Sequence, residues 1–238
     1  SMSITAEVMV SNVFSPSSVM INIVPSIAKS IYQPITDRVF QHGISRVAFK
    51  AALAEYSAMY SVIPSATKMA KTAWDLERSM LTGDSSKFLE DQTHIPKRLK
   101  GHWMRLCPRA MLASDAFFEQ VLYRGHISGQ AAGNAIEEGI AKGLKGKKLD
   151  DFVKDKVVKA VDESYEPNKN PMGVLRADGK STGLQGEALD KHIEEGLEKY
   201  ADSFLTATNE QGIDYANRSL FKNAPSEKNA PSKALKWY

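Results

Sequence analysis

The chain has 238 residues, of which 42% are hydrophobic and 25% charged, so it can bury a core and is not a disordered tail. Its single cysteine, Cys107, excludes an internal disulfide framework and a cysteine-based structural zinc site. The 31 lysines and arginines exceed the 28 acids by only +3, which is too small to indicate a nucleic-acid partner. The local distribution of charge along the sequence is therefore more informative than the net charge.

Charged residues are rare near the amino terminus. Residues 3–64 contain seven of them, namely Glu7, Lys29, Asp37, Arg38, Arg46, Lys50 and Glu55. Such a segment is either ordinary core or a surface that faces a partner, because monomers seldom expose extensive apolar patches. We favour self-assembly over ordinary core, and the residues expected to carry it are Val19, Ile23, Ile27, Ile31 and Tyr32.

Helical periodicity dominates this charge-poor region, residues 1–92. From Ser45 the apolar side chains recur at spacings of three and four along one stripe, namely Val47, Phe49, Leu53, Tyr56, Met59, Tyr60 and Ile63. Proline lacks the amide donor that continues a helix, so it should kink or end one. The expected elements are short pieces divided by Pro25 and Pro34, a helix from Ser45 to Pro64, another over 65–81 and a short one over 85–91.

No targeting or membrane-spanning segment is expected. Ser1-Met2 is typical of a cloning remnant, which indicates a segment taken from a longer protein. The most apolar stretch, residues 19–32, is interrupted by Asn22, Pro25 and Lys29 and is shorter than the roughly 18 apolar residues a spanning helix needs. We therefore expect neither a signal peptide nor a transmembrane helix, although membrane contact stays possible.

The most suggestive polar feature is a basic linker over residues 93–107. Cations with an aromatic residue among them can contact phosphates and stack on bases, whereas a solvated linker has the same composition. The residues that would bind nucleic acid or another acidic partner are Lys97, Arg98, Lys100, Trp103, Arg105 and Arg109. A helical nucleic-acid-binding domain that uses this linker is our alternative function.

Residues 108–210 are predicted to be a second helical region, in which Pro108 opens a long helix. Glycines at positions 125, 129 and 133 lower its intrinsic stability but allow another helix to approach closely. The further elements expected are a helix over 150–164, a loop over 165–185 with a small hairpin over 174–180, a helix over 187–207, and an extended polar tail over 211–238. We expect no internal repeat of fixed period.

Catalytic and metal sites are not indicated. The five histidines lie in different segments without metal-ligand spacing, so we expect no metal, no cofactor and no enzymatic activity. Cys107 with His94 or His102 could form a nucleophilic pair, but a small buried filler is the simpler interpretation. Glu194 and Glu198 share a helix face and could act on a glycan, yet acids on an amphipathic helix usually form a solvated face.

Two stretches resemble the internal virion proteins, or ejection proteins, of short-tailed phages and the related phage large polyvalent protein-associated domains. The first covers residues 10–27 and 31–35, where a serine-containing stretch leads into an apolar helix and a proline. The second covers residues 107–124 and opens a helix with Pro108, Arg109, Met111, Asp115, Phe117 and Phe118, followed by Ala131 and Ala135. The resemblance covers about a third of the chain.

The sequence patterns predict a mostly α, elongated and irregular multi-helix bundle with proline-kinked helices, and the resemblance likewise implies a helical segment. The resemblance also implies a non-catalytic assembly segment of a large virion protein that is delivered with the genome into the host. Copies of the same chain or other virion proteins would be its partners, and DNA is a possible one. The expected location is the virion and then the periplasm or cytoplasm of the host cell.

Overall fold

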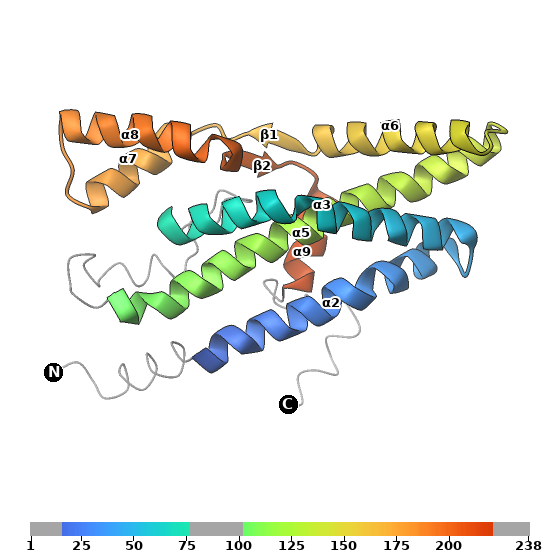
Figure 1. Ribbon diagram of the computed structural model, residues 1–238, viewed down its shortest axis with the longest axis horizontal. Helices are drawn as coiled ribbons and strands as arrows, with labels where there is room; N and C mark the ends of the chain where they lie inside the picture. Colours follow the sequence, from blue (N-terminus) through green and yellow to red (C-terminus); the bar gives the residue numbers. More distant parts are fainter. Residues whose placement is uncertain (1–15, 77–101, 221–238) are drawn as a thin grey trace.

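The computed structural model describes residues 16–76 and 102–220, and these are mostly helical, as predicted (Figure 1). The seven α-helices of this part are α2 (Pro16–His42), α3 (Arg46–Leu76), α5 (His102–Ala141), α6 (Lys147–Glu163), α7 (Pro171–Ser181), α8 (Glu187–Tyr200) and α9 (Glu210–Ser219). Two short strands, β1 (Tyr165–Pro167) and β2 (Leu205–Ala207), and a 3₁₀ turn, η1 (Ala201–Ser203), complete it. The body is elongated, and α3 and α5 run side by side through its middle.

The prolines of the first two helices do not end them. Helix α2 continues through Pro25 and Pro34, and α3 continues through Pro64, so the expected short pieces and the expected break are wrong. An interior proline removes one helical hydrogen bond, and packing against neighbouring helices offsets that loss. Pro34 illustrates this, since its side chain is fully buried in the bundle.

Small residues bring α3 and α5 together, as the glycine spacing predicts. A Cβ atom at Gly125 would lie 2.6 Å from Cγ of Met59, and one at Gly129 would lie 2.4 Å from Oε2 of Glu55. The side of α3 that faces α5 is rich in alanine, including the buried Ala48, Ala51 and Ala52. Met59 of the predicted apolar stripe does face α5, but Phe49, Leu53, Tyr60 and Ile63 of that stripe are exposed.

The predicted loop over residues 165–185 is wrong, because this stretch holds β1 and α7. Asn170 caps α7, its side chain accepting from the amide of Gly173 at 2.9 Å, and Pro171 stands at the first helical position. The expected hairpin over 174–180 lies entirely within this helix. The glycines and prolines of this segment are typical of a loop, and for that reason the sequence pattern predicted one.

The carboxyl-terminal elements also differ from expectation. The helix predicted over 187–207 ends at Tyr200, and η1 and β2 follow it. The tail predicted to be extended over 211–238 begins instead with α9, which Asn209 caps by accepting from the amide of Gly212 at 2.9 Å. The short helix predicted over 85–91 lies outside the described residues. Helix α5 begins at His102, six residues before Pro108 and inside the predicted linker.

The chain contains an internal repeat with a period of 40 residues, contrary to expectation. Each repeat is a helical hairpin, the first hairpin being residues 131–163 and the second hairpin residues 171–203. Identical residues stand at both tips: Gly139, Gly143, Leu144, Gly146, Leu149 and Asp150 recur as Gly179, Gly183, Leu184, Gly186, Leu189 and Asp190. The backbone of Gly146 (φ 55°, ψ −136°) is matched by that of Gly186 (φ 55°, ψ −138°).

A local two-fold axis relates the two hairpins. Strands β1 and β2 pair antiparallel with Glu166 opposite Thr206, its equivalent 40 residues later. The amide of Thr208 donates to the carbonyl of Ser164 at 2.9 Å, and reciprocally the amide of Asn168 donates to the carbonyl of Phe204 at 2.7 Å. The hairpins therefore point in opposite directions, with α6 and α8 end to end along one edge of the molecule (Figure 1).

We expect the replacement of Gly146 or Gly186 by alanine to lower the free energy of unfolding by about 1–3 kcal/mol each. Both glycines have positive φ with ψ near −137°, a backbone conformation that side chains avoid. Urea unfolding followed by circular dichroism measures the loss. The neighbouring exposed residues provide controls, since Lys145→Ala and Gln185→Ala should change stability by less than about 0.5 kcal/mol. Equal losses in all four variants would contradict the argument from backbone conformation.

Candidate assembly surface

Large hydrophobic side chains are exposed along the hairpin formed by α2 and α3. Of the fourteen such residues in the described part of the chain, eleven lie between positions 24 and 63. We use the name α2–α3 apolar face for those that form a stripe on each helix, namely Val24, Ile27, Ile31 and Ile35 on α2 and Phe49, Leu53, Tyr60 and Ile63 on α3. Ile31 is 63% exposed and Tyr60 is 79% exposed, so these side chains lie well outside the core.

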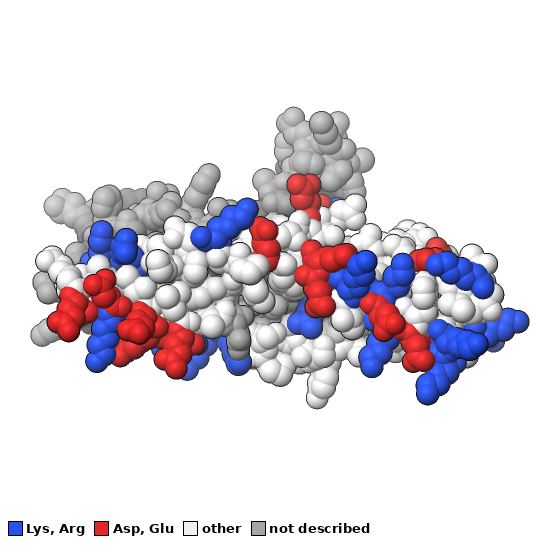
Figure 2. Space-filling model, turned by 90° about the horizontal axis from the view of Figure 1, so that it is seen from above, with Lys and Arg blue, Asp and Glu red and all other residues white. Residues whose placement is uncertain are grey.

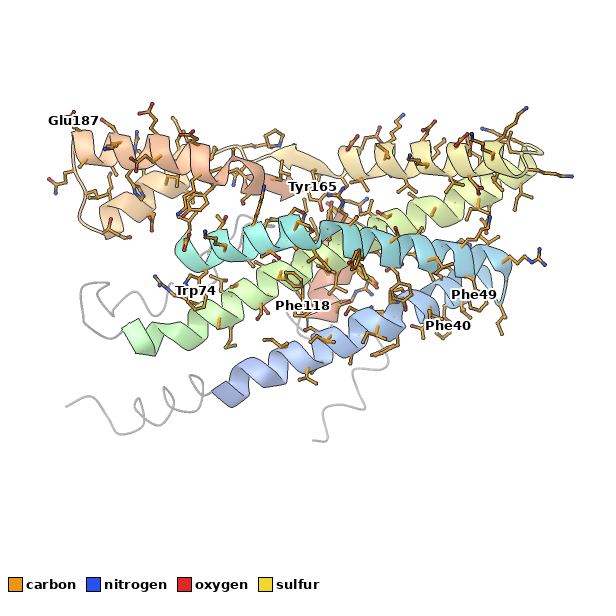
Figure 3. All side chains as sticks on the ribbon, viewed as in Figure 1. Phe40, Phe49, Trp74, Phe118, Tyr165 and Glu187 are labelled. Atoms are coloured by element: carbon orange, nitrogen blue, oxygen red, sulfur yellow. The ribbon has the colours of Figure 1, made fainter. Side chains whose placement is uncertain are left out.

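The two stripes meet along the line where the helices touch. The hydroxyl of Tyr56, which lies between the exposed positions of α3, donates to the backbone carbonyl of Ile31 on α2. Phe49 stands near the turn that joins the helices, whereas Phe40 lies on the other side of α2, beside Asp37 and Arg218 (Figure 3). The result is one continuous surface rather than scattered residues.

Few charges interrupt this surface because two of the six charged residues between positions 16 and 64 are inside the protein. Arg38 and Glu55 are both fully buried, and the Nη2 atom of Arg38 lies 2.7 Å from Oε2 of Glu55. Only Lys29, Asp37, Arg46 and Lys50 then remain for the outer surface of a hairpin of two long helices. The surface of this segment therefore carries even fewer charged residues than its sequence contains.

Arg38 and Glu55 belong to a buried polar cluster that ties four helices together. Its members are Arg38 from α2, Glu55 from α3, His126 from α5 and Tyr215 from α9. Arg38 donates to Glu55 through Nε at 2.8 Å and to the carbonyl of His126 through Nη2 at 3.0 Å. Tyr215 donates to Oε1 of Glu55 at 3.3 Å, and its ring stacks on that of His126 with centroids 4.0 Å apart.

The environment of the buried polar cluster shifts the pKa values of its members. Burial, together with the nearby Arg38 guanidinium, lowers the pKa of His126 to about 3. Burial raises the pKa of Glu55, and Arg38 opposes this by stabilising the carboxylate. Burial also raises the pKa of Asp37, the neighbour of Arg38 on α2. The imidazole of His126 is therefore neutral, and Glu55 has Arg38 as its counter-ion.

The cluster fixes the position of α2 on the bundle and thereby presents the α2–α3 apolar face. A single buried ion pair is satisfied in only one register of the helices that carry it, so it selects that register. Lys29 strengthens the same attachment, since its Nζ donates to the carbonyl of Ser219 at the end of α9, 3.1 Å away. The buried polar side of α2 thus holds the helix in the position in which its apolar side is exposed.

The structure exposes three of the five residues predicted to carry self-assembly, namely Ile27, Ile31 and Tyr32. Ile23 is half-buried, and the side chain of Val19 lies outside the description. The sequence analysis missed the contribution of α3 to this surface. It also missed the buried polar cluster, for which the only sequence signal is an isolated Arg38 and Glu55 in a segment with almost no other charge.

Of the six residues predicted to bind nucleic acid, the structure describes the side chain of Arg109. Lys97, Arg98 and Lys100 lie outside the described residues, and Trp103 and Arg105 fall in α5 without described side chains. Arg109 is half-buried on α5. The role assigned to these six residues stays a prediction.

Within residues 16–76 and 102–220 no group of three metal-ligating side chains comes together. None of the helices seen there has the length and apolar character required to cross a membrane. The acids of α8 are solvated, as predicted for Glu187, Asp190, Glu194, Glu195 and Glu198, all of which are exposed.

Comparison with known proteins identifies no relative: no family model, no curated protein and no solved structure matches the chain.

Proposed function

We propose that this chain is a non-catalytic helical assembly module of a large phage virion protein, of the kind that is delivered with the genome into the host. The α2–α3 apolar face is the observation that carries the assembly role, and the resemblance of residues 10–27, 31–35 and 107–124 to phage ejection proteins supports the setting. Further copies of the same chain or other virion proteins would cover this face.

The physical reason is the cost of leaving so much apolar surface in water. Burial of an isoleucine side chain contributes about 1.5–3 kcal/mol, so a few of them at an interface offset the entropy lost on association. The buried polar cluster holds α2 in place, so its apolar side chains are positioned before a partner arrives. A partner then pays little in reorganisation, which favours association.

We expect Ile27→Glu combined with Ile31→Glu to weaken self-association by at least about tenfold, because each change places a charge in a contact that must exclude water. Sedimentation velocity over a range of protein concentrations measures the effect. Both residues are already exposed, so the helical circular dichroism signal should not change.

Val158→Glu is the matched control, because Val158 is an exposed hydrophobic residue on α6, away from the α2–α3 apolar face. It should associate like the unmodified chain. A chain that stays monomeric at every concentration, or a control that weakens association as much as the double variant, would contradict the proposed function.

A further inference from the structure

The two hairpins have the same backbone at their tips but different charges. Residues 139–149 of the first hairpin contain Lys142, Lys145, Lys147 and Lys148 and no acid, and we call these four lysines the basic tip. All four are exposed. Lys142 lies 2.5 Å from Glu138, while the other three form no ion pair with a described residue. The lysines stand at the extreme end of the elongated molecule, with Glu137, Glu138, Asp150 and Asp151 on the adjoining turns of the two helices, so only the tip itself is positive (Figure 2).

The second hairpin carries the opposite charge. Its helix α8 has acids at spacings of three and four along one side, and we call Glu187, Asp190, Glu194 and Glu198 the acidic flank. All four are exposed, and none pairs with a cation elsewhere in the described chain. Figure 2 shows acidic side chains gathered over α8 at the end of the molecule opposite the basic tip.

Three positions of the acidic flank also have counterparts in the first hairpin, on the side of α6 that borders a groove. Asp150 of α6 pairs with Lys50 of α3 at 3.7 Å, and both line a groove of about 600 Å³ between α3, α5 and α6. Lys154 and Val158 of α6 line the same groove. Forty residues later Asp150, Lys154 and Val158 of α6 become Asp190, Glu194 and Glu198 on α8, and these positions are exposed in both hairpins.

We propose that the basic tip of one copy of this chain binds the acidic flank of α8 on the next copy. Opposite charges of this kind steer association and fix its register. The tip would supply Asp190 with a cation, as Lys50 of α3 supplies one to Asp150 in the first hairpin. This inference rests on the proposed assembly function and adds to it a second contact, separate from the α2–α3 apolar face.

The contact joins two different surfaces and so differs from a two-fold dimer interface. A heterologous contact leaves one basic tip and one acidic flank free at the ends of every open oligomer. Copies therefore add one after another into a line or, if the rotation between copies closes, into a ring. A conduit or a fibre assembled from many copies requires a contact of this type.

The test uses charge reversal on the whole chain. The tip variant carries Lys145→Glu, Lys147→Glu and Lys148→Glu, and the flank variant carries Glu194→Lys and Glu198→Lys. The control variant carries Lys71→Glu, Lys159→Glu and Lys169→Glu, three exposed lysines away from the tip, so that its net charge equals that of the tip variant. Sedimentation velocity and light scattering then give the oligomer size of each.

We expect the tip and flank variants each to weaken head-to-tail association by about tenfold or more, and the control variant to leave it unchanged. An equimolar mixture of the tip and flank variants should associate again, because each then meets the opposite charge. The unmodified protein should lose this contact in about 1 M NaCl, where the Debye length is only about 3 Å.

Other outcomes overturn the inference without touching the proposed function. Association that survives high salt and tip reversal but is lost in Ile27→Glu with Ile31→Glu leaves the apolar face as the assembly surface and removes the head-to-tail contact. Binding of duplex DNA that the tip variant loses, with sedimentation unchanged, would assign the basic tip to nucleic acid instead.

Discussion

Replacement of Arg38 by methionine is expected to lower the free energy of unfolding by about 3–5 kcal/mol, the largest loss among the substitutions considered. The change leaves Glu55 fully buried without its counter-ion. Burial already raises the pKa of Glu55, and Arg38 is the group that opposes the rise, so the carboxyl would have to take up a proton or be exposed. Urea unfolding at neutral pH measures the loss.

The double variant Arg38→Met with Glu55→Met distinguishes the ion pair from simple packing. It removes both charges together and fills the space with unbranched apolar side chains, so it should regain most of the lost stability. Arg46→Met, an exposed arginine at the start of α3, should change stability by less than about 0.5 kcal/mol. If Arg38→Met alone is no less stable than Arg46→Met, the buried pair contributes nothing to the free energy of unfolding.

The sequence predicts the helical class and the closest contact between helices for sound physical reasons. The spacing of Gly125, Gly129 and Gly133 requires a neighbour at short distance, and Met59, Glu55 and His42 provide it. Glycine in a helix carries a cost that only such a contact explains. For this reason the pattern was informative even without knowledge of the partner helix.

Helix boundaries were harder to predict because local signals gave way to tertiary packing. Pro25, Pro34 and Pro64 each predict an interruption, yet packing along the bundle keeps α2 and α3 continuous. The opposite error occurred at α7, where Gly173 and Gly179 indicated a loop. Both glycines are places of close contact, since a Cβ at Gly179 would lie 2.4 Å from Cδ1 of Leu189.

The internal repeat escaped notice because few of its positions are identical. The residues that recur are those that the tip geometry demands, such as Gly146 and Gly186 with positive φ and the leucines that pack against Gly139 and Gly179. Elsewhere Gly133, Lys159 and Asp162 recur as Gly173, Lys199 and Asp202, while most other charged positions differ. Differences such as Lys147 against Glu187 and Lys154 against Glu194 give the two hairpins different charges.

The candidate surface was half predicted for the same reason. Low charge between residues 3 and 64 indicated a partner-facing segment, and Ile27, Ile31 and Tyr32 do lie exposed on α2. Helical periodicity alone did not reveal which side of α3 faces the core, because a stripe of large apolar residues and a stripe of alanines both recur at helical spacing. The glycines of α5 pack against the alanine side of α3, because helices with small side chains at the contact can approach each other most closely.

Acidification from pH 7 to pH 5 is expected to cost about 2 kcal/mol of stability through His126 alone. Its pKa is lowered to about 3 in the folded chain, chiefly by burial, against 6.5 for an ordinary histidine. Between these two values the unfolded chain binds a proton that the folded chain does not, so stability falls as the pH drops below 6.5. Protonation would place a second cation beside Arg38, whose Nη2 lies 3.4 Å from Nδ1 of His126.

The comparison that isolates this effect is the unmodified chain against His126→Gln, both unfolded in urea at pH 7 and at pH 5. Glu55 and Asp37 have raised pKa values, so protonation of these two groups moves stability in the opposite direction, but it does so in both proteins. The free energy of unfolding of the unmodified chain should therefore fall by about 2 kcal/mol relative to that of His126→Gln between pH 7 and pH 5. An unchanged difference would mean that His126 gains a proton in the folded chain, and hence that the cluster admits water or opens. An opening of this kind would release α2 together with the apolar surface that it presents, so the same measurement reports whether the proposed assembly surface keeps its shape in acid.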